Sequence, residues 1–222
     1  MTIRRYGPHA VLLRFAEKPG DDARRRRFAL IAEIERNPPP GLVEYVPGFV
    51  TLLLRFDPAV SADLDRIGLD ISARLSTATL QSPPERPITE IPVIYDGEDL
   101  QALADAKALS PAGVVGLHSA PIYHVQLIGF SPGFPYLGDL HPALHTPRRA
   151  APRPRISAGS VAIGGEHTGI YSVDSPGGWH IIGRTHVRLF DDERAETAVD
   201  PGDVFLLQPG DRVRFVPVEE RT

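Results

Sequence analysis

The chain has 222 residues with 24 basic and 28 acidic side chains, a formal net charge of −4 and no cysteine. This length can bury one large core or two small ones, whereas the missing thiols exclude disulfides, cysteine-based zinc sites and a catalytic cysteine. The acidic surplus argues against nucleic-acid binding. With no apolar run of membrane-spanning length and no signal-peptide core, we expect a cytoplasmic protein without a membrane span.

The first third of the chain begins with a strand pattern followed by a helix pattern. An apolar run at residues 9–15 predicts a strand. Residues 21–36 predict a helix that Asp21 or Asp22 caps and that stops at Asn37, before three prolines. Four consecutive arginines at 24–27 lie near the start of this helix, where positive charge is unfavourable, and we expect a solvated face there.

Two further strands and a second helix follow. Residues 42–46 and 49–56 predict strands joined at Pro47-Gly48. Ser61 is the expected cap of a helix whose apolar spacing continues to Leu75. The order β-α-β-β-α predicts a small α+β domain over residues 1–80.

Residues 81–87 hold three prolines in a polar run, which predicts a linker. After it, the patterns predict strands at 88–95 and 122–130 and helices at 98–108 and at 111–117, the last with Ser110 as its cap. The remaining residues indicate short strands, including 204–207 and 213–216, each preceded by a Pro-Gly-Asp turn. Residues 88–222 therefore predict a mainly β domain, with a closed barrel as the expected architecture.

Glycine and proline make up 43 of the 222 residues, against roughly 27 at average usage. Seventeen of them lie within residues 129–183. Disordered chains lack apolar and aromatic residues, but this span contains Phe130, Phe134, Tyr136, Tyr171 and Trp179, among others. We therefore predict ordered backbone with tight turns, whose usual role is to shape a site.

Several familiar chemistries can be set aside. Gly129–Gly133 matches the nucleophile elbow of serine hydrolases, but Pro132 follows the serine and has no N–H for the oxyanion hole. The sequence contains no P-loop and no dinucleotide fingerprint at the start of a helix. Seven of the eight histidines lie between 118 and 186, but their spacing does not predict a metal site.

Four features remain as candidates. The proline-stiffened loop 147–155 carries four arginines, which suit an anion or a partner surface, or form a solvated loop. His118 ends a short helix, where it is either a cation stabilised by the helix dipole or a residue that transfers a proton or contacts substrate. The amides of Gly177-Gly178 could meet an anion or form a hairpin turn. Arg184 has apolar neighbours and needs a carboxylate such as Glu44, or a bound anion.

The chain resembles the family of the bacterial 5-oxoprolinase B subunit, also called allophanate hydrolase subunit 1 or the Kip-type kinase inhibitor family. The resemblance extends over nearly the whole chain. It is carried by Glu44-Tyr45-Val46-Pro47, His118-Ser119, Gly129-Phe130-Ser131-Pro132-Gly133-Phe134-Pro135-Tyr136-Leu137-Gly138, Pro147-Arg148, Pro152-Arg153, Ala158-Gly159-Ser160-Val161-Ala162-Ile163, Thr168-Gly169-Ile170-Tyr171, Ser175-Pro176-Gly177-Gly178-Trp179 and Ile182-Gly183-Arg184-Thr185. It implies a small α+β N-terminal domain followed by a cyclophilin-like β-barrel.

The resemblance also implies a function. The B subunit acts with two others, named A and C, to open 5-oxoproline to glutamate at the expense of ATP, and the C subunit is homologous to biotin-dependent carboxyltransferases. We expect ATP with Mg²⁺ in the complex, no structural metal, and little activity of this chain alone. The alternatives are an inhibitor that binds a sensor histidine kinase, and the carboxyltransferase part of a urea or amide carboxylase.

Phosphoryl transfer to a lactam needs cationic groups and backbone donors. On this chain we expect His118 and Arg184 to be catalytic. The expected substrate or anion contacts are Glu44, Arg148, Arg153, Gly159, Ser160, Gly177, Gly178 and Trp179.

Overall fold

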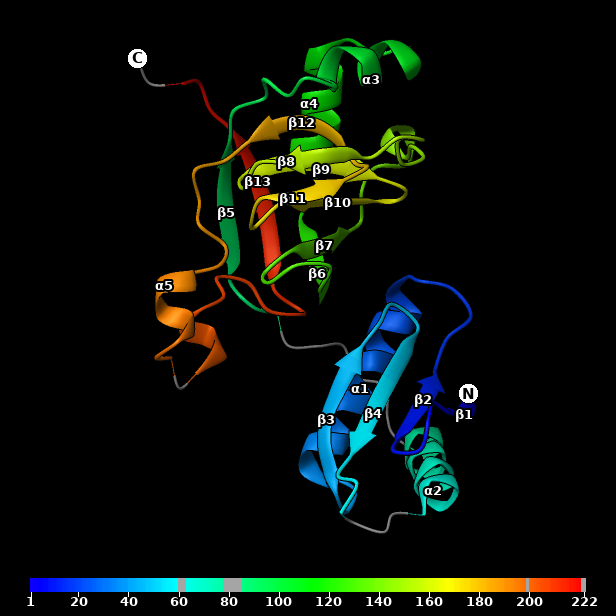
Figure 1. Ribbon diagram of the computed structural model, residues 1–222. Coiled ribbons are helices and arrows are strands. Elements are labelled where there is room, and N and C mark those ends of the chain that lie inside the picture. Colours follow the sequence, from blue (N-terminus) through cyan, green and yellow to red (C-terminus); the bar gives the residue numbers. More distant parts are fainter. Residues whose placement is uncertain (60–62, 78–84, 199, 221–222) are drawn as a thin grey trace. The chain divides into compact units, whose positions relative to one another are not determined.

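The computed structural model describes residues 1–59, 63–77, 85–198 and 200–220 (Figure 1). The chain divides into two compact units, Met1–Glu85 and Arg86–Thr222. Residues 81–84 of the expected linker lie outside the described residues, and so does Ser61, the expected cap of the second helix. No described helix combines the length and the apolar character needed to cross a bilayer.

The N-terminal unit is a four-stranded antiparallel sheet with two helices. Its elements are β1 (Thr2–Arg5), β2 (Ala10–Arg14), α1 (Asp21–Arg36), β3 (Leu42–Pro47), β4 (Thr51–Phe56) and α2 (Leu64–Thr77). The strands lie in the order β1-β2-β4-β3. The first strand, which is polar and lies at an edge, adds a hairpin to the β-α-β-β-α order that the sequence pattern predicts.

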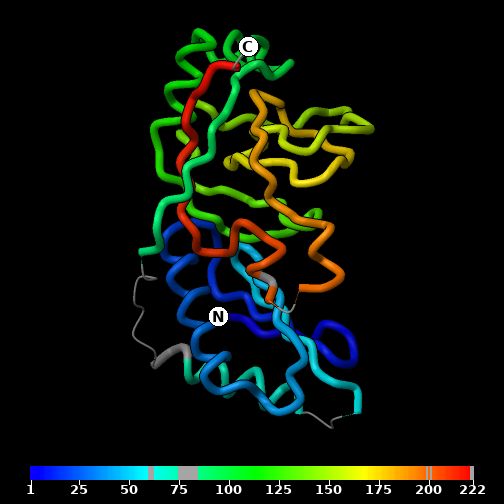
Figure 2. Tube along the Cα trace, turned by 90° about the vertical axis from the view of Figure 1, so that its left-hand side faces the viewer, coloured from blue at the N-terminus to red at the C-terminus, as the bar shows by residue number. Residues whose placement is uncertain are grey.

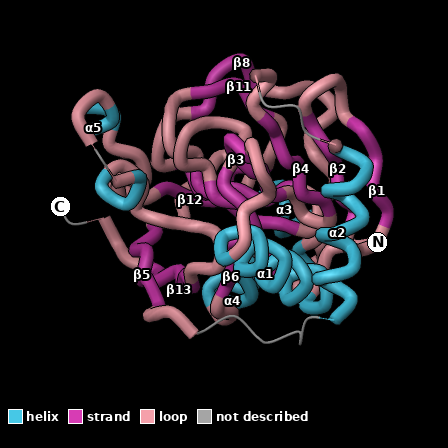
Figure 3. The backbone as a smooth tube through the Cα atoms, turned by 90° about the horizontal axis from the view of Figure 1, so that it is seen from below, coloured by secondary structure: helices cyan, strands magenta, loops and turns pink. Residues whose placement is uncertain are grey.

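Alternation along the strands explains how this unit folds. Leu52, Leu54 and Phe56 on β4 are buried, whereas the residues between them are more exposed. These side chains form a core with apolar residues of α1 and α2, which lie side by side (Figure 3).

Two local expectations for α1 are wrong. Gly20, with a φ of 140°, is the residue before the helix, and no side chain caps it. The arginine run is not wholly solvated either, because Arg27 is 4% exposed and lies 3.4 Å from the carbonyl of Gly48. Burial, with the charge of Arg24, lowers the pKa of Arg27 to about 10. Position 27 lies on the core face of the helix, and that periodicity outweighs the preference of arginine for water.

The C-terminal unit is mainly β. Its strands are β5 (Ile88–Val93), β6 (Tyr123–Ile128), β7 (Pro135–Gly138), β8 (Arg153–Ile156), β9 (Ser160–Gly164), β10 (His167–Ile170), β11 (Ser175–Gly177), β12 (His180–Arg184) and β13 (Arg212–Pro217). Its helices are α3 (Leu100–Ala106), α4 (Pro111–Ser119) and α5 (Asp192–Ala195). The predicted cap of α4 is confirmed, since Ser110 Oγ accepts from the amide of Gly113 at 3.1 Å.

Seven strands form a nearly closed barrel in the order β12-β9-β10-β7-β6-β13-β5. The last pair, β13 and β5, is parallel, and the two run side by side (Figure 2). The ends of the sheet meet where Ile94 and Arg184 exchange two backbone hydrogen bonds of 2.9 and 2.8 Å. The expected α+β fold with a barrel is thus confirmed, although residues 204–207 form only an isolated bridge at Phe205 instead of a strand.

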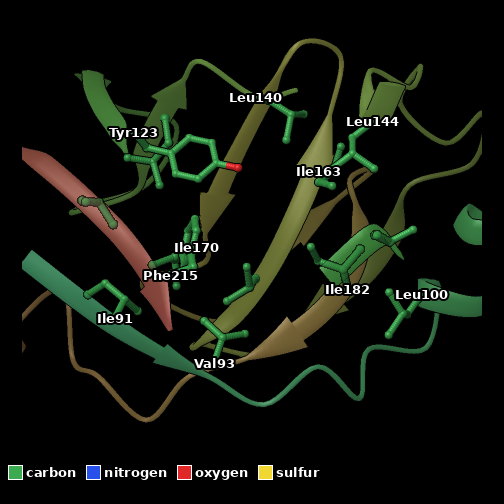
Figure 4. Close-up of a cluster of buried hydrophobic side chains, with 14 of the residues drawn as sticks. Ile91, Val93, Leu100, Tyr123, Leu140, Leu144, Ile163, Ile170, Ile182 and Phe215 are labelled. Atoms are coloured by element: carbon green, nitrogen blue, oxygen red, sulfur yellow. The ribbon is translucent and has the colours of Figure 1, made fainter. Parts of the chain in front are cut away.

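The barrel strands carry different clusters on their two faces. Inside lies the main core, which includes Tyr123, Ile163, Ile182 and Phe215 (Figure 4). On β9 and β12 the alternate residues Ala162 and Ile181 belong instead to a second cluster with Phe134, Ile156, Tyr171 and Trp179. Ile156 comes from β8, which pairs with β11 as a separate two-stranded ribbon. The outer face of the sheet therefore packs under this ribbon.

Candidate functional site

Residues 147–155, predicted as a loop, run into β8 from Arg153 onward in the structure; we keep the name loop for the whole segment, which carboxylates anchor. Arg149 and Arg153 both donate to Oδ1 of Asp99, at 3.0 and 2.8 Å. Arg155 forms an ion pair with Asp174. Three of the four loop arginines are therefore engaged within the fold. This includes Arg153, which the sequence suggests as an anion contact.

Arg148 is the exception in this loop. Its side chain is exposed, and its guanidinium carbon lies 5.8 Å from the ring centroid of Trp179, within the range of a cation–π interaction. The indole is 5% exposed. It rests on Gly164, where a Cβ atom would lie 2.6 Å from the ring. A glycine on β9 thus makes the space into which the single tryptophan of the chain fits.

Arg148 and Trp179 border a cavity of about 60 Å³, which we call the aromatic pocket. The rings pack edge to face, with the centroid of Phe134 5.4 Å from that of Trp179 and 5.3 Å from that of Tyr171. Arg148 is the one charged residue among the eight described residues of the lining. These are Phe130, Phe134, Tyr136, Arg148, Tyr171, Gly177, Gly178 and Trp179. The cavity is smaller than the pockets that enclose whole ligands, so a cation beside apolar walls suits one carboxylate with a small apolar group that rests at the pocket mouth.

Phe130 forms an unusual rim to this pocket. Its backbone has a φ of 72°, in the left-handed region that residues other than glycine rarely adopt. Its ring is 60% exposed and lies 5.4 Å from that of Phe134, centroid to centroid. Strained backbone and an exposed aromatic ring at one position point to a binding role, because neither stabilises the fold.

The structure shows what space and which carbonyl the glycines at the pocket provide, while the anion-binding role expected for their amides stays a prediction. A Cβ atom on Gly177 would lie 2.1 Å from the hydroxyl oxygen of Tyr171, so this glycine gives room to the tyrosine. Gly178 offers its carbonyl, which accepts from the amide of Arg149 at 2.7 Å. Both residues shape the pocket and its attachment to the arginine loop.

Gly159 and Ser160 lie away from the aromatic pocket. The Gly159 amide donates to the carbonyl of Tyr171 at 2.7 Å, and the Ser160 amide donates to that of Ser157 at 3.2 Å. Gly159 has a φ of 84° and lines a second cavity of about 540 Å³, which shares Tyr171 with the pocket. Because their amides are bonded within the fold, these residues do not supply the expected anion donors.

His118 lies in the barrel core with no exposed surface. Thr168 Oγ1 donates to the carbonyl of Ala162 at 2.9 Å, so it accepts from His118 Nε2, 2.8 Å away. Nδ1 then accepts from the hydroxyl of Tyr95 at 2.8 Å. The ring stacks on Phe215, with centroids 4.5 Å apart, and burial lowers the pKa of His118 to about 3. An enclosed neutral imidazole holds the core together, and the expected acid–base role does not fit it.

Arg184 and Glu44 are also paired elsewhere than expected. Arg184 contacts Asp96 and Glu220, both at 2.8 Å, beside the backbone bridge that closes the barrel. Glu44 pairs with Arg55 across β3 and β4 of the N-terminal unit at 2.5 Å. The carboxylate partners shown for Arg184 lie within its own unit, and neither Arg184 nor Glu44 is among the described residues that line the aromatic pocket.

Of the predicted residues, the pocket brings together Arg148, Gly177, Gly178 and Trp179. Sequence reasoning missed the aromatic lining and Asp99. The density of aromatic residues in span 129–183 predicts ordered backbone, and the same density is also a signal for a pocket. The role of Asp99 gives no local signal, because its arginine partners lie 50 and 54 positions away.

Comparisons with known proteins agree with this architecture. Residues 1–199 match the family model "Carboxyltransferase domain, subdomain C and D". The 5-oxoprolinase B subunit of Bacillus subtilis (strain 168) is 35% identical over all of this chain and 96% of its own length. The protein of the same name from Escherichia coli O157:H7 is 45% identical over 82% of this chain and 80% of its own length.

A solved structure extends the comparison to the fold. The crystal structure of TTHA0988 matches all of this chain with a TM-score of 0.79 and 41% identity. This chain spans 41% of that longer chain. With the fold, the family model and the full-length relatives in agreement, the chain belongs to the family of carboxyltransferase domain subdomains C and D, which includes bacterial proteins named as the B subunit of 5-oxoprolinase.

Proposed function

We propose that this chain is the B component of an ATP-dependent 5-oxoprolinase and acts with the C and A components to open 5-oxoproline to L-glutamate. The observation that carries the proposal is the 35% identity to a 5-oxoprolinase B subunit over all of this chain and 96% of that relative. The match to two fifths of a longer chain is consistent with a part that works inside a larger assembly.

The aromatic pocket is our candidate for the substrate contact on this chain. 5-Oxoproline is a compact ring with one carboxylate. Arg148 would bind the carboxylate, and the aromatic side chains that line the pocket, with the exposed ring of Phe130 at its rim, would contact the apolar part of the ligand. Burying this part against aromatic walls excludes water from one side and fixes its orientation.

In the complex, ATP would phosphorylate the lactam oxygen and leave as ADP. Water would then add to the carbon, the C–N bond would break to free the amine as an acyl phosphate forms, and a second water would release inorganic phosphate and glutamate. The described residues include no group of three His, Cys, Asp or Glu side chains that could hold a metal ion. We derive no phosphoryl-transfer step on this chain. The proposal leaves ATP with Mg²⁺ to the assembled complex and gives this chain the binding and orientation of 5-oxoproline.

The test is reconstitution. The chain is purified alone and with its C and A components, and ADP and glutamate are measured with and without 5-oxoproline. We expect turnover only from the complex. A complex that releases no ADP in response to 5-oxoproline would refute the proposal. In that case, binding to a histidine kinase, or carboxylation in the presence of a biotin carrier, would identify one of the alternatives.

Variants at Arg148 then test the pocket. Arg148→Ala removes the cation, so KM for 5-oxoproline should rise about tenfold or more. Arg148→Lys keeps the charge and should lose less. Arg194→Ala is the charge-matched control, because Arg194 is exposed on α5 and pairs with Asp191 outside the pocket. Equal KM values for Arg148→Ala and the control would exclude the aromatic pocket as the carboxylate site.

A further inference from the structure

The two halves of the aromatic pocket come from separate segments. Arg148 lies on loop 147–155, and Trp179 lies just before β12. Both Arg148 and Trp179 lie within two residues of a residue that donates a hydrogen bond to Asp99. Arg149 follows Arg148 directly, and the backbone amide of Ile181, two residues after Trp179, donates to Asp99 Oδ2 at 2.7 Å.

The three hydrogen bonds that the structure shows for the side chain of Asp99 all come from those segments. Oδ1 accepts from Arg149 and Arg153, and Oδ2 accepts from Ile181. Asp99 is the residue before α3, where an aspartate commonly caps its own helix, but its side chain makes no capping bond. Its 6% exposure makes the charge costly unless it is paired.

The charge state agrees with this arrangement. Burial alone would raise the pKa of Asp99, but the bonds from Arg153 and Ile181 and the charge of Arg149 lower it. Asp99 is therefore ionised at neutral pH and holds both arginines. Two other contacts also link the segments, from the Arg149 amide to the Gly178 carbonyl at 2.7 Å and between His180 Nε2 and the Pro147 carbonyl at 3.0 Å. With these in place, loss of Asp99 should loosen the loop without detaching it.

We propose that Asp99 is a positioning residue, which fixes the loop against β12 and so holds Arg148 over the indole of Trp179. It does not touch the ligand. The effect on activity rests on the proposed function, whereas the effect on the pocket itself does not.

The test variant is Asp99→Asn. An amide keeps one acceptor oxygen but turns an N–H₂ group toward donors, so at least one of the three donors loses its partner. Asp105→Asn is the matched control, since Asp105 lies on α3, the helix that begins directly after Asp99, and its carboxylate accepts from Gln101 of the same helix at 2.8 Å. Both variants are measured in the full chain.

Trp179 provides a direct readout because it is the one tryptophan of the sequence. In Asp99→Asn we expect its emission to shift to the red and iodide quenching to rise, with far-UV circular dichroism unchanged. In the reconstituted complex, KM for 5-oxoproline should rise about tenfold with kcat within about twofold. Asp105→Asn should match the wild type in each measurement.

A double variant separates positioning from a general structural effect. If Asp99 acts through Arg148, adding Asp99→Asn to Arg148→Ala should change KM little further. If the two substitutions raise KM by factors that multiply in the double variant, the proposal is wrong. It is also wrong if the Trp179 emission and iodide quenching of Asp99→Asn equal those of Asp105→Asn. If Asp99→Asn does not fold, Arg149→Gln removes one donor and should raise quenching to a smaller extent. Iodide quenching of Trp179 that is unchanged in Arg149→Gln would also overturn the proposal. If the wild-type complex fails to turn over 5-oxoproline, the function is wrong and the fluorescence still decides the role of Asp99.

Discussion

Phe130 shows at a single residue how the pocket departs from what folding alone favours. Its backbone has the left-handed conformation, which is strained for residues other than glycine. Phe130→Gly and Phe130→Ala remove the same ring, but alanine keeps the strain. We expect the glycine variant to be more stable than the alanine variant by about 1 kcal/mol, measured by urea unfolding. Equal stabilities would show that position 130 is not strained.

His118 predicts a pH dependence. It is neutral in the folded barrel, where its pKa is about 3, against an ordinary value of 6.5. The unfolded chain therefore binds one more proton between these values, and acidification favours unfolding. The stability contribution is complete above pH 6.5 and is lost as the pH falls toward 3, at a slope of about 1.4 kcal/mol per pH unit.

His118→Gln tests this dependence. Glutamine can accept from Tyr95 and donate to Thr168, but it does not titrate. Urea unfolding at pH 7 and pH 5 should show a smaller loss of stability on acidification than in the wild type. An unchanged difference between the two pH values would mean that another group takes up the proton.

Local sequence signals predicted residues of the pocket, but they did not distinguish site residues from polar residues that stabilise the fold. Arg148 and Trp179 are predictable because a cation in a proline-rich loop and a lone tryptophan after two glycines are local signals. His118 and Arg184 were equally conspicuous, but their partners Tyr95, Thr168, Asp96 and Glu220 come from distant segments. Whether a polar side chain belongs to a site or to the fold depends on such long-range contacts.

At the scale of elements, the segment between β5 and α3 seals the barrel. Its amides at Gly97 and Asp99 donate to the carbonyls of Ile182 and Ile181. A Cβ atom on Gly97 would lie 2.3 Å from the carbonyl carbon of Ile182. Since β12 backbone cannot move without opening the barrel, we expect Gly97→Ala to lower the free energy of unfolding by at least about 2 kcal/mol.

Gly116→Ala is the matched control for this prediction. Gly116 lies within α4, and a Cβ atom there meets nothing within 4 Å. Alanine should stabilise the helix by about 0.5–1 kcal/mol. Chemical denaturation of both variants would test whether the close contact of Gly97 with β12 stabilises the barrel. A Gly97→Ala variant as stable as the wild type would contradict this prediction.

Elements with strong periodicity were predictable, and those that depend on neighbours were not. The helix at 21–36 and the strands around 10–14, 51–56 and 212–217 follow from the spacing of apolar residues. The edge strand β1 escaped notice because three of its four residues are polar or charged. The apolar run at 204–207 has strand composition, but its Phe205 bridges to Phe190 and stacks on its ring instead of extending the sheet.

At the scale of the whole molecule, the two units have separate hydrophobic cores. The core of the first unit draws only on residues before 86, and both clusters of the second draw only on residues after it. Since each core lies within one continuous stretch of chain, each unit has the means to fold alone. The composition of the sequence pointed to this division through the prolines at 81–87, although not to which side chains form each core.

Separate cores make a prediction that Trp179 can report. It lies in the second unit, so its fluorescence follows unfolding of that unit alone, whereas far-UV circular dichroism follows both. We expect residues 86–222, expressed alone, to fold with the Trp179 emission of the full chain and the same urea midpoint. A lower midpoint in the fragment would mean that the first unit stabilises the second. Equal midpoints, with Asp99→Asn raising iodide quenching to the same extent in both, would show that the barrel unit builds the aromatic pocket by itself.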